Sequence, residues 1–540
     1  MRISKNLNIN LILLSVVFFV AVFLRFYALD KIPGSLNPDE VSLGYTSFSL
    51  LHTGADEHGV FLPLALQSFG DWKLPVYPYL GMIPTAVFGL NAFSVRFTSA
   101  IAGVIGVLLA YYLSLKLFKR KSIALFAALF YCLSPWDIYF SRAAYEVNLA
   151  TTFFLAGTSL FLKYLEVEKN RAGWLTLSGI FFGITVFTYN SYIVFTPLFV
   201  AGLVYLYKEK IKLNFELLVP VLIFAIMVIA SFYSSIFTST NKTSTLLVFN
   251  DANTIYNRIE KIRGDKASNS PVEKIIYNKV TGGLYQFGQN YLSAFSPSFL
   301  FDKGGEKLVD NLGYFGNLYL IDVLFIFAGL AGLLLQKEKS LKLLLVWLLL
   351  APIPAALTKT PQSSTRLFLL MPILVIISAY GLFQIMTFLQ KKSVKNYCLK
   401  LLLLVLFVYN VSLFMDGYFV HLNMQRARFW DYGYQQAVEF SQKYPDYKIV
   451  MRGPENFPYI YFLFYNQYPP KKFISEVKYY PPTSEGFLYV KSFGRFSFPT
   501  TLDKISMTPK TIYIDDNYLR FKDKIFLPSG EPVLAYYINR

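Results

Sequence analysis

Residues 9–28 read INLILLSVVFFVAVFLRFYA, and this stretch decides the class of fold. It holds one charged residue, Arg25, and its length matches the roughly 20 apolar residues that an α-helix needs to cross a bilayer core. Ten further apolar stretches follow, so the sequence predicts eleven membrane-spanning helices. They are residues 9–28, 95–115, 122–137, 146–165, 174–190, 192–207, 215–237, 315–335, 341–358, 367–389 and 399–415.

The composition of the 540 residues agrees with a membrane protein. Hydrophobic residues make up 54% and charged residues only 16%, against about 25% charged in an average soluble domain. These values exclude a disordered, fibrous or ordinary soluble chain. The net charge of +18 lacks a recognisable nucleic-acid-binding module, so we interpret it as loop charge and expect no nucleic acid as a partner. The two cysteines, Cys132 and Cys398, cannot form a disulfide framework.

The distribution of Lys and Arg predicts the orientation. If residues 74–93 do not cross the membrane, 19 basic residues share the side of the N-terminus and seven lie at the opposite side. The positive-inside rule then predicts a cytoplasmic N-terminus in the cell membrane. The 19 are Arg2, Lys5, Lys116, Lys119, Arg120, Lys121, Lys163, Lys169, Arg171, Lys208, Lys210, Lys212, Lys337, Lys339, Lys342, Lys391, Lys392, Lys395 and Lys400.

Residues 74–93 are apolar but hold Pro75, Pro78 and Pro84 within eleven residues, which disfavours a regular spanning helix. A crossing here would also move every later basic loop to the outside. We therefore expect a membrane-surface or re-entrant helix on the outer side.

Three regions are expected outside the membrane: residues 29–94, 238–314 and the tail from 416. The tail predicts a small α/β domain, so the chain divides into a membrane domain, 1–415, and an extracytoplasmic domain, 416–540. A helix is expected over 435–442. The expected strands are 447–451, 486–491, 511–515, 524–527 and 533–538, with Ser529-Gly530 as the turn between the last two.

The candidate catalytic residues lie in Asn37-Pro38-Asp39-Glu40 of the first outer loop. Two adjacent carboxylates point in different directions and can serve different roles. One can accept a proton from an acceptor hydroxyl, and the other can orient a lysine, a metal or the sugar. A solvated helix N-cap at Asp39 is the structural alternative.

Cations in three other outer loops are candidate phosphate ligands. Lys73 lies at the predicted lipid–water boundary. A lysine there can bind a phosphate, or it can merely extend its ammonium group from the lipid to the water. Arg142 is four residues from Glu146, which predicts a pair on one helix face, and it too can hold a lipid phosphate. Arg366 lies at the outer end of the hairpin formed by 341–358 and 367–389, as a phosphate ligand or an interfacial anchor.

Soluble-type sites are missing from the sequence. It has no phosphate-binding glycine loop, no dinucleotide fingerprint and no Cys/His cluster with zinc spacing. His52 and His58, near Asp56 and Glu57, give a weak metal signal. No cofactor is predicted, although a divalent metal stays open. Asp56, Asp137 and Glu146 are expected to support the site.

The order of several motifs resembles a known family. They are Arg25-Phe26-Tyr27, Pro38-Asp39-Glu40, Thr53-Gly54-x-Asp56 with Gly59 and Pro63, Lys73-x-Pro75, Gly89-x-Asn91, Ser94-x-Arg96, Ser134-Pro135, Ser141-Arg142 with Glu146, Arg366-x-Phe368-Leu369-Leu370-x-Pro372 and Trp430-x-Tyr432-Gly433-Tyr434. The chain resembles bacterial glycosyltransferase family 39 of the GT-C class, whose relatives include protein O-mannosyltransferases and the lipid A aminoarabinose transferase. Leu74 stands where the family often has a second proline, and a histidine found near Arg366 in some relatives is absent.

The resemblance implies an α-helical GT-C membrane protein that transfers a sugar from a polyprenyl-phosphate donor on the outer membrane face. An inverting reaction would use Asp39 as base, Glu40 to orient the site, and Lys73, Arg142 and Arg366 to neutralise the leaving phosphate. The acceptor stays open among lipid, glycan and protein. Two alternatives stay open as well: a transporter or flippase of lipid-linked sugars, and a membrane scaffold whose tail binds a partner.

Overall fold

The computed structural model describes residues 2–211, 217–238, 247–250, 255–256, 259–261, 271–335, 339–390, 393–483, 486–503 and 505–540. Lys212, Lys337, Lys391 and Lys392 of the orientation argument, and part of the second outer region, lie outside these residues. The chain forms two compact units. The first comprises 1–23, 103–139 and 147–414, and the second comprises 24–102, 140–146 and 415–540.

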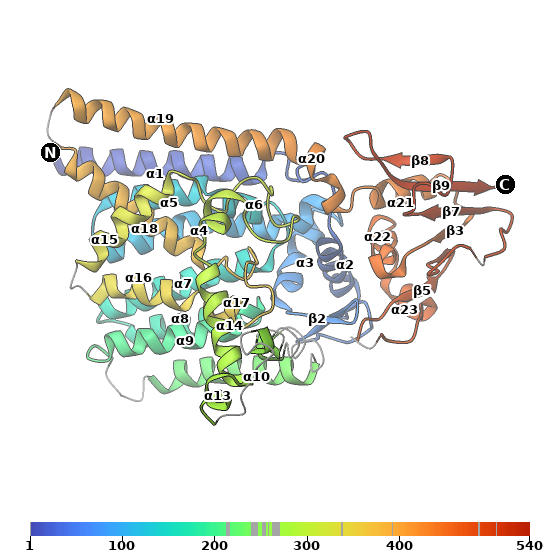
Figure 1. The fold of residues 1–540 in the computed structure, drawn as a ribbon, viewed down its shortest axis with the longest axis horizontal. Coiled ribbons are helices and arrows are strands. Elements are labelled where there is room, and N and C mark those ends of the chain that lie inside the picture. The colour runs from blue at the N-terminus through green and yellow to red at the C-terminus, as the bar shows by residue number, and fades with distance from the viewer. Residues whose placement is uncertain are drawn as a thin grey trace. The chain divides into compact units, whose positions relative to one another are not determined.

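The first unit is helical (Figure 1). Its α-helices, of which α1, α4, α6, α7 and α19 extend into the second unit, are α1 (Arg2–Phe26), α4 (Ala92–Phe118), α5 (Lys121–Leu133), α6 (Pro135–Ser141), α7 (Glu146–Glu166), α8 (Arg171–Val186), α9 (Asn190–Tyr207), α10 (Leu218–Thr238), α13 (Pro271–Ile276), α14 (Lys279–Ser293), α15 (Asp322–Leu334), α16 (Lys339–Leu350), α17 (Ile353–Ala356), α18 (Leu370–Phe388) and α19 (Val394–Asp416).

A helix lies at each of the eleven predicted spans. Among the residues that the structure describes, five segments are long and apolar enough to cross a membrane: Ile9–Phe26, Ala92–Phe118, Asn190–Tyr207, Leu370–Phe388 and Val394–Gln425. The pair α5 and α6 makes a sixth if it counts as one span bent by 54°. The multi-helical membrane fold is therefore confirmed, and the number of eleven spans stays a prediction.

Close packing inside the first unit depends on small residues. A Cβ atom on Gly381 of α18 would overlap the Phe325 carbonyl oxygen of α15, and one on Gly329 would overlap the Ile377 carbonyl oxygen. Glycine at both positions lets the two backbones touch, which is how helices associate in a lipid environment that offers no hydrophobic driving force.

Residues 74–93 fold into α3 (Val76–Phe88), with Pro84 inside the helix. A helix of 13 residues is about 20 Å long, well short of the ~30 Å hydrocarbon core. The helix is too short to cross the bilayer alone, which agrees with the expected surface or re-entrant helix. Its position in the membrane stays a prediction.

The second unit joins the first outer loop to the tail. The loop contributes α2 (Pro38–Thr53), the antiparallel hairpin of β1 (Leu66–Ser68) and β2 (Asp71–Lys73), and α3. Helix α2 packs against α3 and against α22 (Pro458–Tyr465) of the tail. A Cβ on Gly44 of α2 would lie 2.6 Å from the Phe464 ring, so a glycine permits this close approach.

The tail forms the expected α/β domain. Its sheet has the order β4-β5-β6-β3-β7-β9-β8, in which β3 runs parallel to β6 and β7 and the other pairs are antiparallel (Figure 1). The strands are β3 (Lys448–Met451), β4 (Lys478–Tyr479), β5 (Val490–Phe493), β6 (Phe496–Ser497), β7 (Thr511–Asp515), β8 (Asp523–Phe526) and β9 (Pro532–Asn539). The remaining helices are α20 (Leu422–Gln425), α21 (Tyr434–Gln442), α22 and α23 (Pro470–Glu476).

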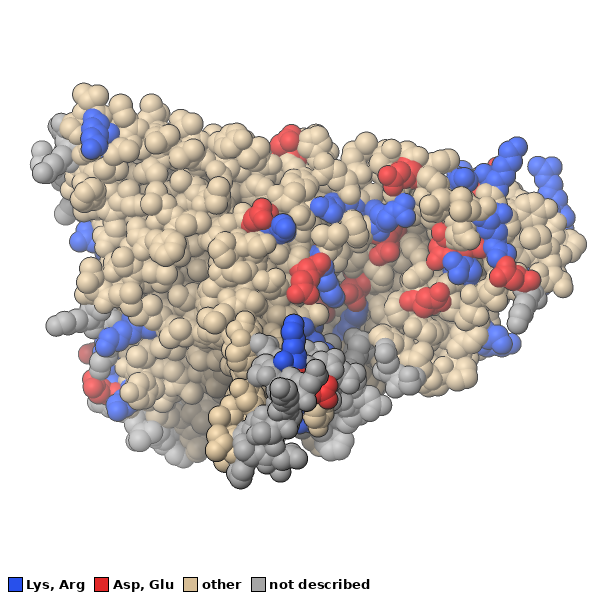
Figure 2. Space-filling view, in the orientation of Figure 1, with Lys and Arg blue, Asp and Glu red and all other residues tan. Residues whose placement is uncertain are grey.

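Most of the predicted tail elements are confirmed. The helix over 435–442 is α21, and four predicted strands coincide with β3, β7, β8 and β9 within two residues at each end. The strand expected at 486–491 lies later, as β5. Lys, Arg, Asp and Glu are frequent on the tail and sparse over most of the helical face that Figure 2 shows.

The boundaries of the two compact units differ from those of the predicted domains. One cut falls between Phe414 and Met415, next to the predicted boundary, but residues 24–102 and 140–146 group with the tail rather than with the membrane helices. The division into 1–415 and 416–540 stays a prediction.

Candidate functional site

The first turn of α2 separates the two candidate carboxylates. Asn37 caps the helix, because its side chain accepts a hydrogen bond from the Glu40 backbone N–H and the Glu40 side chain accepts one from the Asn37 backbone N–H. Successive residues of a helix point about 100° apart. As a result, the side chain of Asp39 is 75% exposed, whereas Glu40 is 1% exposed. Asn37 rather than Asp39 is the N-cap.

Glu40 binds Arg96 of α4 inside the second unit. Arg96 Nε donates to Glu40 Oε1 at 2.9 Å and Nη2 donates to Oε2 at 3.2 Å. The backbone N–H of Ala144 donates to Oε1 at 2.9 Å. With the N-cap bond, both carboxylate oxygens of Glu40 are hydrogen-bonded within the second unit.

Two buried arginines hold the segment 24–35 that leads into α2. Arg96 Nη1 donates to the carbonyls of Leu29 and Pro33, and Nη2 donates to that of Ser35. The guanidinium of Arg142 donates to the carbonyls of three further residues, Leu24, Ala28 and Ile32. We call Arg96, Arg142 and the segment 24–35 the arginine frame. It fixes the backbone that carries Asp39.

The expected pairing of Arg142 with Glu146 is wrong. Arg142 lies in a turn between α6 and α7, and Glu146 is the first residue of α7. The two therefore do not share a helix, and spacing by four residues no longer brings them together. The Arg142 guanidinium instead packs on the rings of Tyr418 and Phe419, at 5.5 and 4.7 Å.

Burial also changes what Arg142 can do. The residue is fully buried, and burial lowers the pKa of its guanidinium, with the charges of Arg96 and Arg25 acting in the same direction. Its Nε is buried and has no hydrogen-bond acceptor among the described residues.

Asp39 and Lys73 form an ion pair at the surface of the second unit. Lys73 Nζ lies 3.0 Å from Asp39 Oδ1 and 3.4 Å from the Asp39 carbonyl oxygen. The lysine is 13% exposed, ends strand β2, and lies over the ring of Phe69 at 5.1 Å. An ion pair that is open to water on one side contributes little stability.

The tail contributes to the second unit an aspartate, Asp431, that the sequence did not suggest. Asp431 follows Trp430, whose ring lies 5.8 Å from the Arg96 guanidinium. Burial raises the pKa of Asp431 to about 7, and the charge of Asp39 adds to this shift. The only signal in the sequence was the motif Trp430-x-Tyr432-Gly433-Tyr434, in which Asp431 is the unspecified position.

Asp56 supports the loop after α2. Its Oδ1 accepts hydrogen bonds from the backbone N–H groups of His58 and Val60, at 2.9 and 3.0 Å. Glu57 accepts a hydrogen bond from the Tyr459 hydroxyl of α22 at 3.1 Å, and His58 Nε2 lies 3.5 Å from Glu57 Oε1. Among the residues that the structure describes, no three His, Cys, Asp or Glu side chains are grouped so that they could hold a metal.

Arg366 and Asp137 belong to the first unit. Arg366 Nη1 donates to Thr358 Oγ1 at 3.1 Å and to Thr360 Oγ1 at 2.6 Å, so the guanidinium is held by its own loop and is half-buried. Asp137 is fully buried in the first turn of α6. Lys73, Asp39, Glu40, Arg142, Glu146 and Asp56 belong to the second unit.

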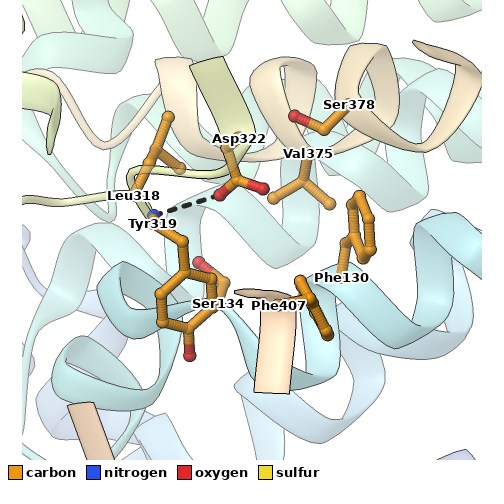
Figure 3. Close-up of a pocket in the computed structure, with 8 residues that line it drawn as sticks. All are labelled: Phe130, Ser134, Leu318, Tyr319, Asp322, Val375, Ser378 and Phe407. Atoms are coloured by element: carbon orange, nitrogen blue, oxygen red, sulfur yellow. Dashed lines mark hydrogen bonds between the residues drawn. The ribbon is translucent and has the colours of Figure 1, made fainter. Parts of the chain in front are cut away.

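A small cavity inside the first unit is not a substrate site. It holds about 10 Å³ and is lined by Phe130, Ser134, Leu318, Tyr319, Asp322, Val375, Ser378 and Phe407 (Figure 3). The Tyr319 backbone N–H donates to Asp322 Oδ2 at 3.1 Å. This volume fits about one water molecule and excludes a sugar.

Comparison with known proteins identifies the fold. Residues 73–233 match the family model described as dolichyl-phosphate-mannose-protein mannosyltransferase. ArnT from Cupriavidus metallidurans, solved with undecaprenyl phosphate, is 11% identical with a TM-score of 0.53, and the match covers 97% of both chains. No curated protein matches the chain in sequence.

The archaeal oligosaccharyltransferase AglB from Archaeoglobus fulgidus, solved with an inhibitory peptide and a dolichol-phosphate, is 15% identical with a TM-score of 0.52. That match covers 84% of this chain, which spans 63% of the AglB chain. At these identities the likeness concerns the fold, and the chain has the GT-C fold that the sequence resemblance predicted.

Proposed function

We propose that the protein is a membrane glycosyltransferase that moves a sugar from a polyprenyl-phosphate donor to an acceptor on the outer face of the membrane. One observation carries the proposal: an exposed carboxylate, Asp39, lies 3.0 Å from a partly buried lysine, Lys73, on a backbone that the arginine frame fixes. The partial match to a mannosyltransferase family model supports it, and so do the undecaprenyl phosphate and the dolichol-phosphate with which ArnT and AglB were solved.

In the proposed reaction, Asp39 accepts the proton and Lys73 binds the leaving phosphate. The acceptor oxygen attacks the anomeric carbon of the donor sugar, and the bond from that carbon to the phosphate oxygen breaks. The phosphate leaves with the electron pair and binds the Lys73 ammonium, while the acceptor proton moves to Asp39. Attack opposite the leaving phosphate inverts the anomeric configuration.

Glu40 has a positioning role in this proposal. Its two oxygens are bound by Arg96, Asn37 and Ala144, so it holds the first turn of α2 instead of touching the sugar. Arg142 and Arg366 remain predicted phosphate ligands. Arg142 would use its Nε, and Arg366 would use the guanidinium that Thr358 and Thr360 orient.

We further propose a cytoplasmic N-terminus and an extracytoplasmic tail. Single cysteines can test this in a variant in which serine replaces Cys132 and Cys398. Ser122, Lys210 and Ser529 are exposed in the structure. An impermeant thiol reagent added to intact cells should label only Ser529→Cys. Labelling of Lys210→Cys would overturn the orientation.

Ligand-induced thermal stabilisation of the purified protein tests the donor class. Undecaprenyl phosphate at 100 times its Kd should stabilise the folded state by about 2.7 kcal/mol, whereas undecaprenol, which lacks the phosphate, should not. Lys73→Met should remove most of this effect. Lys31→Met, which removes an exposed lysine of the same loop, should leave it unchanged. Equal stabilisation by both lipids, or by neither, contradicts the proposed donor.

A further inference from the structure

A groove opens in the first unit between the first half of α19 and the helices α15 and α18. It holds about 400 Å³, against about 10 Å³ for the cavity of Figure 3. Of the nine described residues that line it, eight are apolar, and the ninth is Gln384. The Gln384 amide donates to the Tyr380 hydroxyl at 2.9 Å. Helix α19 contributes Leu399, Leu402 and Leu403 to the lining.

The groove exists because α19 packs on the unit through its second half. Phe407 stacks on Phe130 of α5 with ring centroids 5.2 Å apart, and the Asn410 side chain accepts a hydrogen bond from the Leu320 backbone N–H at 3.1 Å. Near the end of the helix, Phe414 is the one buried residue among those of α19. One to two turns before Phe407, the groove takes the place of such contacts.

The size and the lining of the groove fit a hydrocarbon chain. An apolar cavity of about 150 Å³ binds one benzene molecule, so 400 Å³ has room for roughly 16 carbon atoms. That is about the length of one acyl chain of a membrane lipid. The groove is open at its side, since the lining residues Phe388 and Leu402 are 85% and 51% exposed. A chain can therefore enter it from the bilayer.

The chain around the start of α19 is basic. Residues 388–403 read FLQKKSVKNYCLKLLL, with four lysines and no Asp or Glu. On the face that Figure 2 shows, the described residues at the start of α19 include basic but no acidic side chains. The complementary ligand for this end of the groove is therefore an anion.

Two of these lysines lie next to the lining residues of α19. Lys395 precedes Leu399 by four residues and Lys400 precedes Leu403 by three, so each lies about one turn before a lining residue on the same side of the helix. Helical side chains lean toward the N-terminus of their helix. In agreement, the Lys400 ammonium lies 5.7 Å from the centre of the Tyr397 ring, three residues earlier. Both charges thus lie toward the start of α19.

We propose that the groove binds one anionic phospholipid, with an acyl chain between α19 and the pair α15–α18 and with the phosphate at Lys395 and Lys400. In the proposed orientation this end of α19 is at the cytoplasmic face, where anionic lipids make the membrane surface negative. The donor phosphate reacts at the opposite face, so a polyprenyl phosphate is not the occupant. The bound lipid fills the space beside α19 and holds the first half of this helix to the unit.

Native mass spectrometry of the purified full chain tests the headgroup, through the affinity for the first lipid bound. Dioleoyl phosphatidylglycerol should bind more tightly than dioleoyl phosphatidylcholine, which has the same chains and no net charge. Lys395→Gln should lower this preference roughly fivefold. Lys208→Gln, which changes an exposed lysine at the end of α9, should leave it unchanged. Equal affinity for the two lipids, or an equal loss in both variants, overturns the proposal.

A second pair of variants tests the groove itself. Leu402→Trp and Leu404→Trp each replace an exposed leucine of α19, but only Leu402 lines the groove. Overfilling the groove should weaken binding of phosphatidylglycerol roughly tenfold in Leu402→Trp, and Leu404→Trp should bind like the wild type. Equal affinities in these two variants overturn the proposal. Displacement of the phospholipid by undecaprenyl phosphate, with loss of undecaprenyl phosphate binding in Leu402→Trp, would assign the groove to the donor and overturn it as well.

Discussion

Arg96 binds Glu40 through two hydrogen bonds, from Nε to Oε1 at 2.9 Å and from Nη2 to Oε2 at 3.2 Å, and both side chains are buried. The remaining N–H groups of Arg96 bind the carbonyls of Leu29, Pro33 and Ser35. One ion pair therefore joins α4, the first turn of α2 and the loop between α1 and α2. The exposed Asp39 depends on this pair for its position.

Removing the charge of Glu40 should destabilise the protein. Glu40→Gln leaves the buried Arg96 guanidinium without its counter-charge, which costs about 3–5 kcal/mol of unfolding free energy. Thermal denaturation in detergent should show a lower midpoint. Glu531→Gln is a suitable control, because its partner Arg428 lies 3.4 Å away at the surface and such pairs contribute about 0–1 kcal/mol. Equal denaturation midpoints for Glu40→Gln and Glu531→Gln would contradict a stabilising role of the arginine frame.

Asp39→Asn should lower turnover and leave the stability of the protein unchanged. The amide keeps the volume of the exposed side chain but cannot accept the acceptor proton, so turnover should fall by about 10²–10⁴ while the denaturation midpoint stays within a few degrees of the wild type. Sugar transfer at saturating donor measures this. Asp30→Asn, an exposed aspartate of the same loop, is the matched control. Retention of more than roughly a tenth of the wild-type rate is incompatible with a general base.

Arg366→Met should weaken donor binding. Methionine keeps much of the stem and removes the guanidinium that Thr358 and Thr360 hold. A lost charged hydrogen bond corresponds to about 1.5–3 kcal/mol, seen as a higher donor Michaelis constant with little change for the acceptor. Lys359→Met removes an exposed charge of the same loop and should have no effect. A rise in the acceptor constant alone would assign Arg366 to another role.

The contact between the first outer loop and the tail should make stability depend on pH through His58. Burial disfavours its protonation, but the nearby negative charges of Glu57 and Asp56 outweigh burial and raise the pKa of His58 above 6.5. Tyr479 faces the same ring, with its hydroxyl 3.4 Å from Nδ1. Because the folded pKa is raised, this stabilisation is complete below pH 6.5 and is lost as the pH rises through the folded pKa.

Denaturation midpoints between pH 6 and pH 8.5 measure this effect. The wild-type midpoint should fall across the range, and His58→Gln should remove the share due to His58. His52→Gln, a histidine exposed on α2, should keep the wild-type slope. Equal slopes in the two variants would show that His58 does not link protonation to folding.

The sequence predicted the apolar helices because the hydropathy of each is a local property of its own residues. A run of apolar residues such as 370–388 must be helical in lipid, since no water satisfies its backbone. The tail strands β7 and β9 were readable for a similar reason: each is a short run rich in Val, Ile and Tyr between turn residues. The acidic motif Asp39-Glu40 was also evident in the sequence, as adjacent charges after a proline.

Three features of the site needed the tertiary structure. Asp39 is exposed and Glu40 is buried because the helix that Asn37 caps turns the two side chains in different directions. The buried Glu40 forms an ion pair with Arg96, which lies 56 residues away in the sequence. The break between α6 and α7 separates Arg142 from Glu146 in a way that spacing by four residues could not reveal. Trp430 of the tail meets Arg96 only through packing of the tail on the first outer loop.

The sequence by itself thus determined the membrane class, the positions of the long apolar helices and the presence of acids and cations in the predicted outer loops, because hydropathy and charge act over one element at a time. The tertiary structure alone decided which charges are buried, which pair and which face a substrate. The protonation of a side chain and the groups that it can contact depend on its burial and on its distances to other groups, not on residue type alone. Residues far apart along the chain, such as Glu40, Arg96 and Asp431, produce that burial and those distances.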